Sequence, residues 1–95
     1  MAKRANWNKE LGWQPVAYVC SRRGFAVEIG YNPVQENEYR WCVQFAGSGH
    51  YYQSAEETVA YCISRKWCKA ENADMLRSKI LANAERLTAG MEVAQ

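Results

Sequence analysis

Histidine and aspartate each occur only once in this 95-residue sequence, as His50 and Asp74. A Ser/His/Asp or Cys/His/Asp catalytic site would therefore need both residues, with a serine or cysteine brought beside them by the fold. Residues 47–49 read Gly-Ser-Gly, but they lack the longer glycine frames of phosphate-cradling loops. We expect no catalytic residues, no cofactor and no enzyme activity.

The four cysteines lack the C-x-x-C pairs of a structural zinc site, since they stand at positions 20, 42, 62 and 68. The first eleven residues, MAKRANWNKEL, lack the apolar core of a signal peptide, and no apolar run reaches membrane-spanning length. We therefore expect free thiols in a reducing cytoplasm, no bound metal and no membrane partner.

An excess of one charge is also missing, because 12 basic and 10 acidic residues give a net charge of +2. Dedicated nucleic-acid domains usually concentrate more positive charge on one face. The chain is 48% hydrophobic, with four Trp, six Tyr and two Phe, which is typical of a compact chain. We expect one domain over residues 1–95, with residues 1–5 and 91–95 loose.

Three segments carry strand patterns: residues 16–20 are β-branched or aromatic, and residues 25–31 and 39–45 alternate apolar with polar or small side chains. A turn at residues 21–24 places Cys20 opposite Phe25, Tyr18 opposite Val27 and Val16 opposite Ile29. One face of this meander is then apolar. The other face is expected to be flat and open for contact, with Trp7, Leu11 and Trp13 over part of it; it would carry Ala17, Val19, Ala26, Glu28, Gly30, Arg40, Cys42 and Gln44.

Helical patterns dominate the second half. Residues 51–67 include a capping box, Ser54 with Glu57, and an apolar stripe that ends at Trp67. Residues 47–50 are expected to be a flexible connection, and residues 51–52 to add a short edge strand. A second helix is predicted over residues 72–89, with Asn72 as its cap and Gly90 as its stop, and a helical turn or two over residues 7–11. The predicted fold is α+β, a three- or four-stranded antiparallel meander with two C-terminal helices packed on one face.

The candidate binding residues are arginines and tyrosines. Arg22 and Arg23 lie at the expected hairpin tip and Arg40 on the open face, where each can contact a phosphate or an acidic surface. The tyrosines exceed what a core requires, and such residues are typical anchors of protein interfaces. The tyrosines that we expect in an interface are Tyr31, Tyr39, Tyr51 and Tyr61.

Two nucleic-acid-binding families share parts of this pattern. Residues 25–29 (Phe-Ala-Val-Glu-Ile) and 54–57 (Ser-Ala-Glu-Glu), with Ala60-Tyr61, resemble a strand and the helix entry of the three-stranded DNA-binding domains of plant Apetala-type factors and phage integrases. That resemblance implies DNA recognition by arginines and tryptophans on the open sheet face. In this sequence the only basic residue expected on that face is Arg40. The order helix, three strands, helix is similar to double-stranded RNA-binding domains, but acidic residues 56–57 stand where those domains are basic.

In overall style, a one-domain, aromatic-rich, cysteine-containing chain resembles small phage proteins that inhibit host machinery, anti-CRISPR proteins among them. This resemblance implies a non-enzymatic inhibitor that contacts a host protein or a ribonucleoprotein complex, such as a CRISPR effector, in the host cell's cytoplasm. The alternative is a DNA- or RNA-binding domain that uses the sheet face and the basic hairpin tip. The sequence leaves the oligomeric state open.

Overall fold

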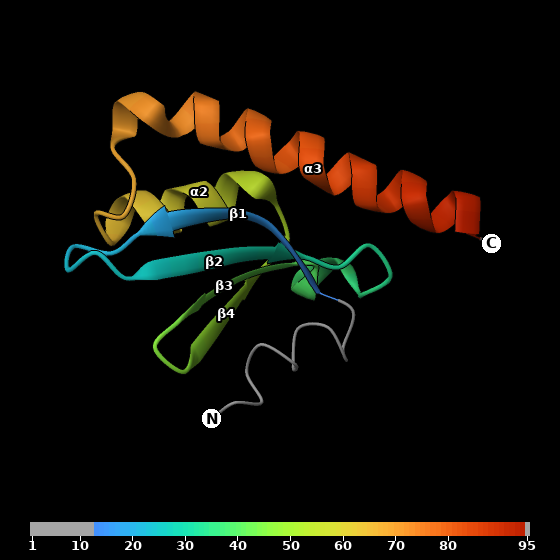
Figure 1. Ribbon diagram of the computed structural model, residues 1–95, viewed down its shortest axis with the longest axis horizontal. Helices are drawn as coiled ribbons and strands as arrows, with labels where there is room; N and C mark the ends of the chain where they lie inside the picture. The colour runs from blue at the N-terminus through green and yellow to red at the C-terminus, as the bar shows by residue number, and fades with distance from the viewer. Residues whose placement is uncertain (1–12, 95) are drawn as a thin grey trace.

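The protein folds as a four-stranded antiparallel sheet covered on one side by two helices (Figure 1), which confirms the predicted α+β class. The computed structural model describes the backbone of residues 13–94 and the side chains of residues 13–90. The predicted turns at residues 7–11 and the loose residues 1–5 lie outside this range. In chain order the elements are β1 (Gln14–Cys20), β2 (Ala26–Tyr31), η1 (Asn37–Tyr39), β3 (Trp41–Phe45), β4 (Ser48–Tyr52), α2 (Ala55–Ser64), η2 (Ala70–Asn72) and α3 (Ala73–Ala94).

The β1–β2 hairpin has a three-residue loop, so the predicted register is wrong by one residue. The Ser21 amide donates to the Phe25 carbonyl, and the Gly24 amide donates to the Ser21 carbonyl. Gly24 has a φ of 87°, as in a type I turn followed by a left-handed residue. Cys20 therefore pairs with Ala26, and Tyr18 pairs with Glu28.

This register moves side chains between the two faces of the sheet. Tyr18 is 58% exposed on the face without helices, whereas Ala17 is buried and Val19 packs against the core, contrary to prediction. The pairing shifts between Pro15 and Ala17, which is why consecutive Val16 and Ala17 are both buried. The carbonyl of Val16 accepts a hydrogen bond from Nδ2 of Asn83 on α3 at 2.6 Å, so α3 is joined to the edge strand.

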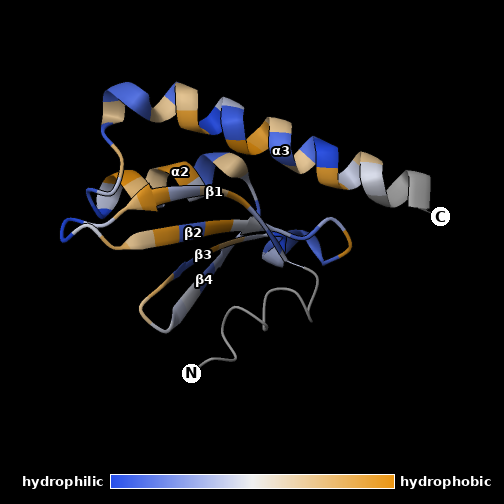
Figure 2. Ribbon diagram, in the orientation of Figure 1, coloured by the Kyte–Doolittle hydropathy of each residue, from blue (hydrophilic) through white to orange (hydrophobic). Residues whose placement is uncertain are grey.

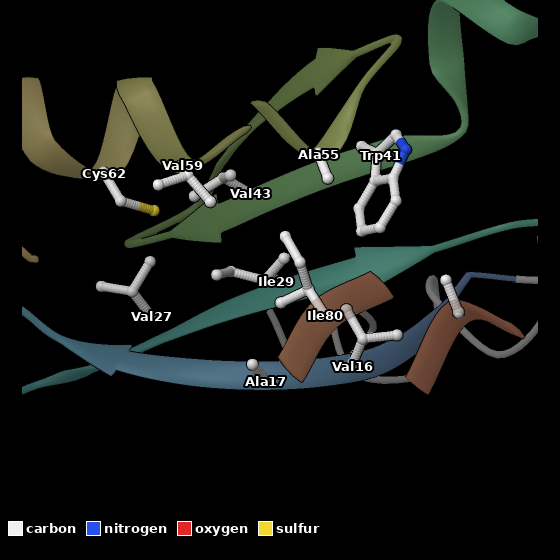
Figure 3. Packing of buried hydrophobic residues seen from close by; sticks show 11 residues of the cluster. Val16, Ala17, Val27, Ile29, Trp41, Val43, Ala55, Val59, Cys62 and Ile80 are labelled. Atoms are coloured by element: carbon white, nitrogen blue, oxygen red, sulfur yellow. The ribbon is translucent and has the colours of Figure 1, made fainter. Parts of the chain in front are cut away.

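The core lies between the sheet and the two helices (Figure 3). It receives side chains from β1, β2, β3, α2 and α3, and Ile29 and Ile80 are completely buried where β2 faces α3. Burial of such a side chain contributes about 1.5–3 kcal/mol. The members are Val16, Ala17, Val27, Ile29, Trp41, Val43, Ala55, Val59, Cys62, Ile80 and Ala84.

The β3–β4 connection is a two-residue turn, not the flexible segment predicted for residues 47–50. Ala46 and Gly47 both have positive φ values, 51° and 96°, as a tight hairpin turn requires. Residues 48–50 therefore already belong to β4. The predicted third strand also begins later, because Tyr39 lies in η1 and β3 starts at Trp41.

Helix α2 has the predicted cap but is shorter than residues 51–67. Ser54 Oγ accepts from the Glu57 amide at 3.1 Å, while Glu57 reaches back to the Gln53 amide and not to Ser54. After Ser64 the chain leaves the helix through Lys66, which has a φ of 65°. The Trp67 amide donates to the Cys62 carbonyl, the bond of a Schellman motif, so Trp67 lies beyond the helix end.

Helix α3 packs its predicted stripe onto the core but continues past Gly90. Ile80 and Ala84 are buried, and Ala73, Leu76 and Leu87 pack at the margin. Gly90 does not end the helix because its φ is not in the left-handed region that such a stop requires. The helix backbone extends to Ala94, into the segment 91–95 that the sequence predicts to be loose.

Candidate binding groove

Three turns that are distant in sequence meet at one end of the sheet and form a groove. The β1–β2 loop, the β3–β4 turn and the end of α2 all point to the same side of the molecule (Figure 1). The space between them has a volume of about 860 Å³. We call this space the groove; it is lined by Ser21, Arg22, Arg23, Phe25, Ala26, Phe45, Ala46, Ser64, Arg65, Lys66 and Trp67.

Four positive charges line the groove, and no acidic residue is among the described residues of its lining. Arg22 and Arg23 belong to the three-residue loop, the strongly hydrophilic hairpin tip in Figure 2. Arg65 and Lys66 follow α2, and all four side chains belong to exposed residues. Among the described residues the one ion pair joins Arg77 to Asp74 on α3. The groove is therefore a concave surface of positive potential.

Three aromatic rings stand among these charges. Trp67 has contacts with three side chains. Its ring centroid lies 5.2 Å from that of Phe45 and 5.7 Å from that of Tyr61. The guanidinium carbon of Arg65 lies 5.4 Å from the Trp67 ring centroid. Phe25 differs, because it is 62% exposed and takes part in none of the ring contacts between described residues. The groove thus offers a supported indole and a free phenyl ring.

A second aromatic group, at the opposite end of the sheet, is packed on itself. The ring of Tyr51 lies 5.5 Å from that of Trp13 and 5.8 Å from that of Tyr39. Nε1 of Trp13 donates to the Tyr39 carbonyl at 3.0 Å, and Trp13 is only 4% exposed. Trp13 also covers Gly30, where an added Cβ would lie 3.8 Å from the Cβ of Trp13. We call Trp13, Tyr39 and Tyr51 the closing cluster.

Among the described residues, the strands of the sheet face opposite the helices carry no lysine or arginine. None of the four strands contains lysine or arginine, and their only acidic residue is Glu28. Burial first, then the charge of Glu28 and a hydrogen bond to it, raise the pKa of the Tyr18 hydroxyl. Arg40, predicted on this face, lies before β3 and donates from Nε to the Gln35 carbonyl at 2.8 Å. The strands of this face therefore offer no lysine or arginine to a phosphate.

The structure does not bring the predicted binding residues into one site. Arg22 and Arg23 line the groove, and Tyr39 and Tyr51 belong to the closing cluster. The other predicted tyrosines lie near the core: Tyr31 packs on Trp41 with centroids 4.6 Å apart, and Tyr61 packs on His50, Tyr52 and Trp67.

Sequence reasoning missed the other half of the groove. The sequence places Arg65 and Lys66 within the helix predicted for residues 51–67, Trp67 at the end of its apolar stripe, and Phe25 on the apolar sheet face. The Ser-Arg-Arg-Gly segment was the available signal, because a three-residue loop places Phe25 at its base. That the end of α2 meets this loop depends on tertiary packing alone.

None of the four cysteines lines the groove. All four cysteines are free, and the described residues contain no group of three or more His, Cys, Asp and Glu side chains that could hold a metal. Burial, and then the Glu28 charge, raises the pKa of Cys42 to about 12; burial, and then Cys68, raises that of Cys62 to about 12. Within the described chain, no helix has the length and apolar character needed to cross a membrane.

His50 and Asp74 are engaged on different elements. The ring of His50 lies 5.1 Å from that of Tyr61, and Asp74 binds Arg77 at 2.6 Å. Neither residue lines the groove. The only pair from which a histidine–aspartate catalytic site could be built therefore does not meet there.

Comparison with known proteins finds no matching family model, no similar curated protein and no similar solved structure. The observed order, four strands and then two helices, also places an additional strand between the third strand and the helix of the Apetala-type pattern. The function must therefore be inferred from the residues of the groove.

Proposed function

We propose that this protein is a non-enzymatic binding protein whose partner carries nucleic acid, as a ribonucleoprotein complex does, and that phosphates of this partner bind in the groove. The observation that carries the proposal is the set of four exposed cations, Arg22, Arg23, Arg65 and Lys66, around one concave surface without an acidic lining residue. Phosphate contacts from Lys and Arg supply most of the affinity of proteins for nucleic acid.

The distribution of charge supports this location. The whole chain has a net charge of only +2, so four cations that surround one space mark a strong local asymmetry. The strands of the sheet face opposite the helices contain Glu28 and no lysine or arginine. The sequence predicts a nucleic-acid-binding surface made of the sheet face and the hairpin tip. We keep the hairpin tip in this surface and replace the sheet face by the end of α2.

A ribonucleoprotein partner also contains protein, so it agrees with the protein contact that the sequence predicts. The exposed tyrosines Tyr18 and Tyr39, 58% and 47% accessible, are available to the protein part of such a complex. Inhibition of a host complex, a phage origin and a cytoplasmic location stay predictions of the sequence.

Salt-dependent binding tests the proposal. A labelled ten-nucleotide DNA or RNA is titrated with the protein at two salt concentrations, and fluorescence anisotropy gives the dissociation constant. Four phosphate contacts imply a slope of about −3 in log K against log salt, so affinity should fall about 50-fold between about 50 and about 200 mM salt. Arg22→Ala, Arg23→Ala, Arg65→Ala and Lys66→Ala should each reduce the slope by somewhat under one.

Arg86→Gln provides the matched control, because it removes an exposed positive charge from α3 about 20 Å along the helix from its start. This variant should keep the full slope. No binding at low salt, or a slope that the four variants leave unchanged, would refute the proposal. A glutamate decamer bound as tightly as the oligonucleotide would assign the groove to an acidic protein instead.

A further inference from the structure

We propose that the groove takes a single strand of nucleic acid and that one of its bases stacks on Phe25. This inference rests on the proposed function, and it names which form of nucleic acid the groove binds. It starts from the one large apolar ring that the fold leaves exposed beside the four cations.

The backbone fixes the position of Phe25. Its amide donates to Ser21 Oγ at 3.0 Å, and its carbonyl accepts from the Ser21 amide at 2.8 Å. The residue before it, Gly24, has a φ of 87°, a backbone conformation that residues other than glycine rarely adopt. The backbone of Phe25 is therefore held at the base of a tight loop, so little backbone conformational entropy would be lost when a ligand covers the ring.

Phenylalanine has no polar atom, so an exposed ring at this place gains nothing from water. The lining of the groove also contains cations, Arg22 and Arg23 from the loop before Phe25 and Arg65 from the end of α2, and the guanidinium of Arg65 lies against the Trp67 ring. Rings interleaved with arginines are the surface that binds a strand: the cations contact the phosphates while the bases stack on the rings.

A duplex does not fit this chemistry as well. In a duplex the flat faces of the bases are covered by neighbouring base pairs, so the ring of Phe25 would meet only sugars and phosphates. In a single strand the bases are free to unstack and lie on an aromatic side chain. The groove volume of about 860 Å³ also lies within the ordinary range of ligand sites, which suits a few nucleotides and not the width of a double helix.

Three probes with the same number of phosphates test the inference by fluorescence anisotropy: a ten-nucleotide oligothymidylate, the corresponding abasic strand, and a hairpin duplex. The protein should bind the thymidylate at least about fivefold more tightly than the abasic strand, the lower end of the effect of one stacked base. Phe25→Leu keeps an apolar side chain but removes the ring, and should bring the affinity for thymidylate down to that for the abasic strand.

Tyr39→Leu is the matched control, since it removes an exposed ring from the closing cluster, and it should keep the preference for thymidylate. Equal binding of the thymidylate and the abasic strand by the unmodified protein would overturn the inference while the proposed function stands. Tighter binding of the duplex, or a preference that Phe25→Leu leaves intact, would overturn it in the same way. Failure to bind any of the three probes would refute the proposed function itself. Replacing the thymidylate by oligouridylate then shows whether RNA or DNA is preferred.

Discussion

The two ends of the sheet each carry three aromatic residues, yet they use them in opposite ways. In the closing cluster the rings of Trp13, Tyr39 and Tyr51 contact one another, Trp13 is almost completely buried, and no cation lies in the strands beneath. In the groove, four cations line the same space as the rings, and Phe25 takes part in none of the ring contacts between described residues.

This difference shows that the number of aromatic residues does not identify a binding surface. Rings that pack against one another stabilise the fold, as in the closing cluster, where each ring pair adds about 0.5–1.5 kcal/mol to the stability beyond the effect of burial. A ring held in place by its backbone but left uncovered, with cations around it, is available to a ligand. We assign the packing of the closing cluster to stability and the binding of nucleic acid to the groove.

Removal of Trp13 should have the largest effect on stability. Trp13→Ala removes a buried ring and leaves the Tyr39 carbonyl without its donor, so the free energy of unfolding should fall by about 3–5 kcal/mol. Urea denaturation followed by circular dichroism measures the loss. Trp13→Phe, which keeps a ring, should lose less. An unchanged midpoint for Trp13→Ala would show that the closing cluster does not stabilise the sheet.

Alkaline pH should lower the stability of the fold, in part through the buried thiol of Cys42 on the sheet face of the closing cluster. The pKa of Cys42, on the same face as Tyr51, is raised from 9.0 to about 12, chiefly by burial. Above pH 9 the unfolded chain loses this proton while the folded protein keeps it, so stability falls as pH rises, by up to about 1.4 kcal/mol per pH unit for this thiol. Denaturation of the protein and of Cys42→Ala from pH 8 to 10.5 isolates the contribution of Cys42, and the variant should show the shallower decline. Equal declines would place the titrating groups elsewhere.

The exposed rings Tyr39 and Phe25 make the most direct matched pair. Tyr39→Ala should lower the free energy of unfolding by about 0.5–1.5 kcal/mol and leave oligonucleotide affinity unchanged, because its ring packs on Tyr51. Phe25→Ala should leave stability within about 0.5 kcal/mol of its original value, as for other surface substitutions, and weaken oligonucleotide binding. Thermal melts and anisotropy titrations of both variants decide the matter. The opposite pattern would exchange the roles of the two regions.

The smallest expected effect concerns the turn at the rim of the groove. Ala46 has a φ of 51°, where asparagine is better tolerated, so Ala46→Asn should raise the free energy of unfolding by about 0.5–1 kcal/mol without changing affinity. Ala46→Val should have the opposite effect on stability, since a β-branched residue is strained at positive φ. Urea denaturation of the two variants measures both, and a stabilised valine variant would contradict the assigned turn.

The sequence predicts the regular elements well and the turns poorly. Alternation in residues 27–31 and the stripe through Ile80 and Ala84 predict β2 and α3 because period and burial agree. The hairpin register was missed because Ser-Arg-Arg-Gly fits both a three- and a four-residue loop, and the two place Tyr18 on opposite faces. The end of α2 was missed because the left-handed position is filled by Lys66, where a glycine would have marked it.

Only part of the groove can be predicted from the sequence. Arg22 and Arg23 are recognisable as an exposed basic tip, whereas Arg65 and Trp67 join them only because α2 runs back across the sheet to the same end. Sequence patterns within single elements do not predict that the three turns lie close together. It follows from packing Val59 and Cys62 onto the core, which fixes where α2 ends.

Amide chemical-shift mapping of oligothymidylate binding tests the central claim most directly. In the ¹⁵N-labelled protein, the account predicts that the largest shift changes cluster at residues 21–26, 45–47 and 64–67, the three turns that form the groove. The amides of Trp13, Tyr39 and Tyr51 should change little. Shift changes centred on the closing cluster or on the open sheet face around Glu28, with the three turns unaffected, would contradict it.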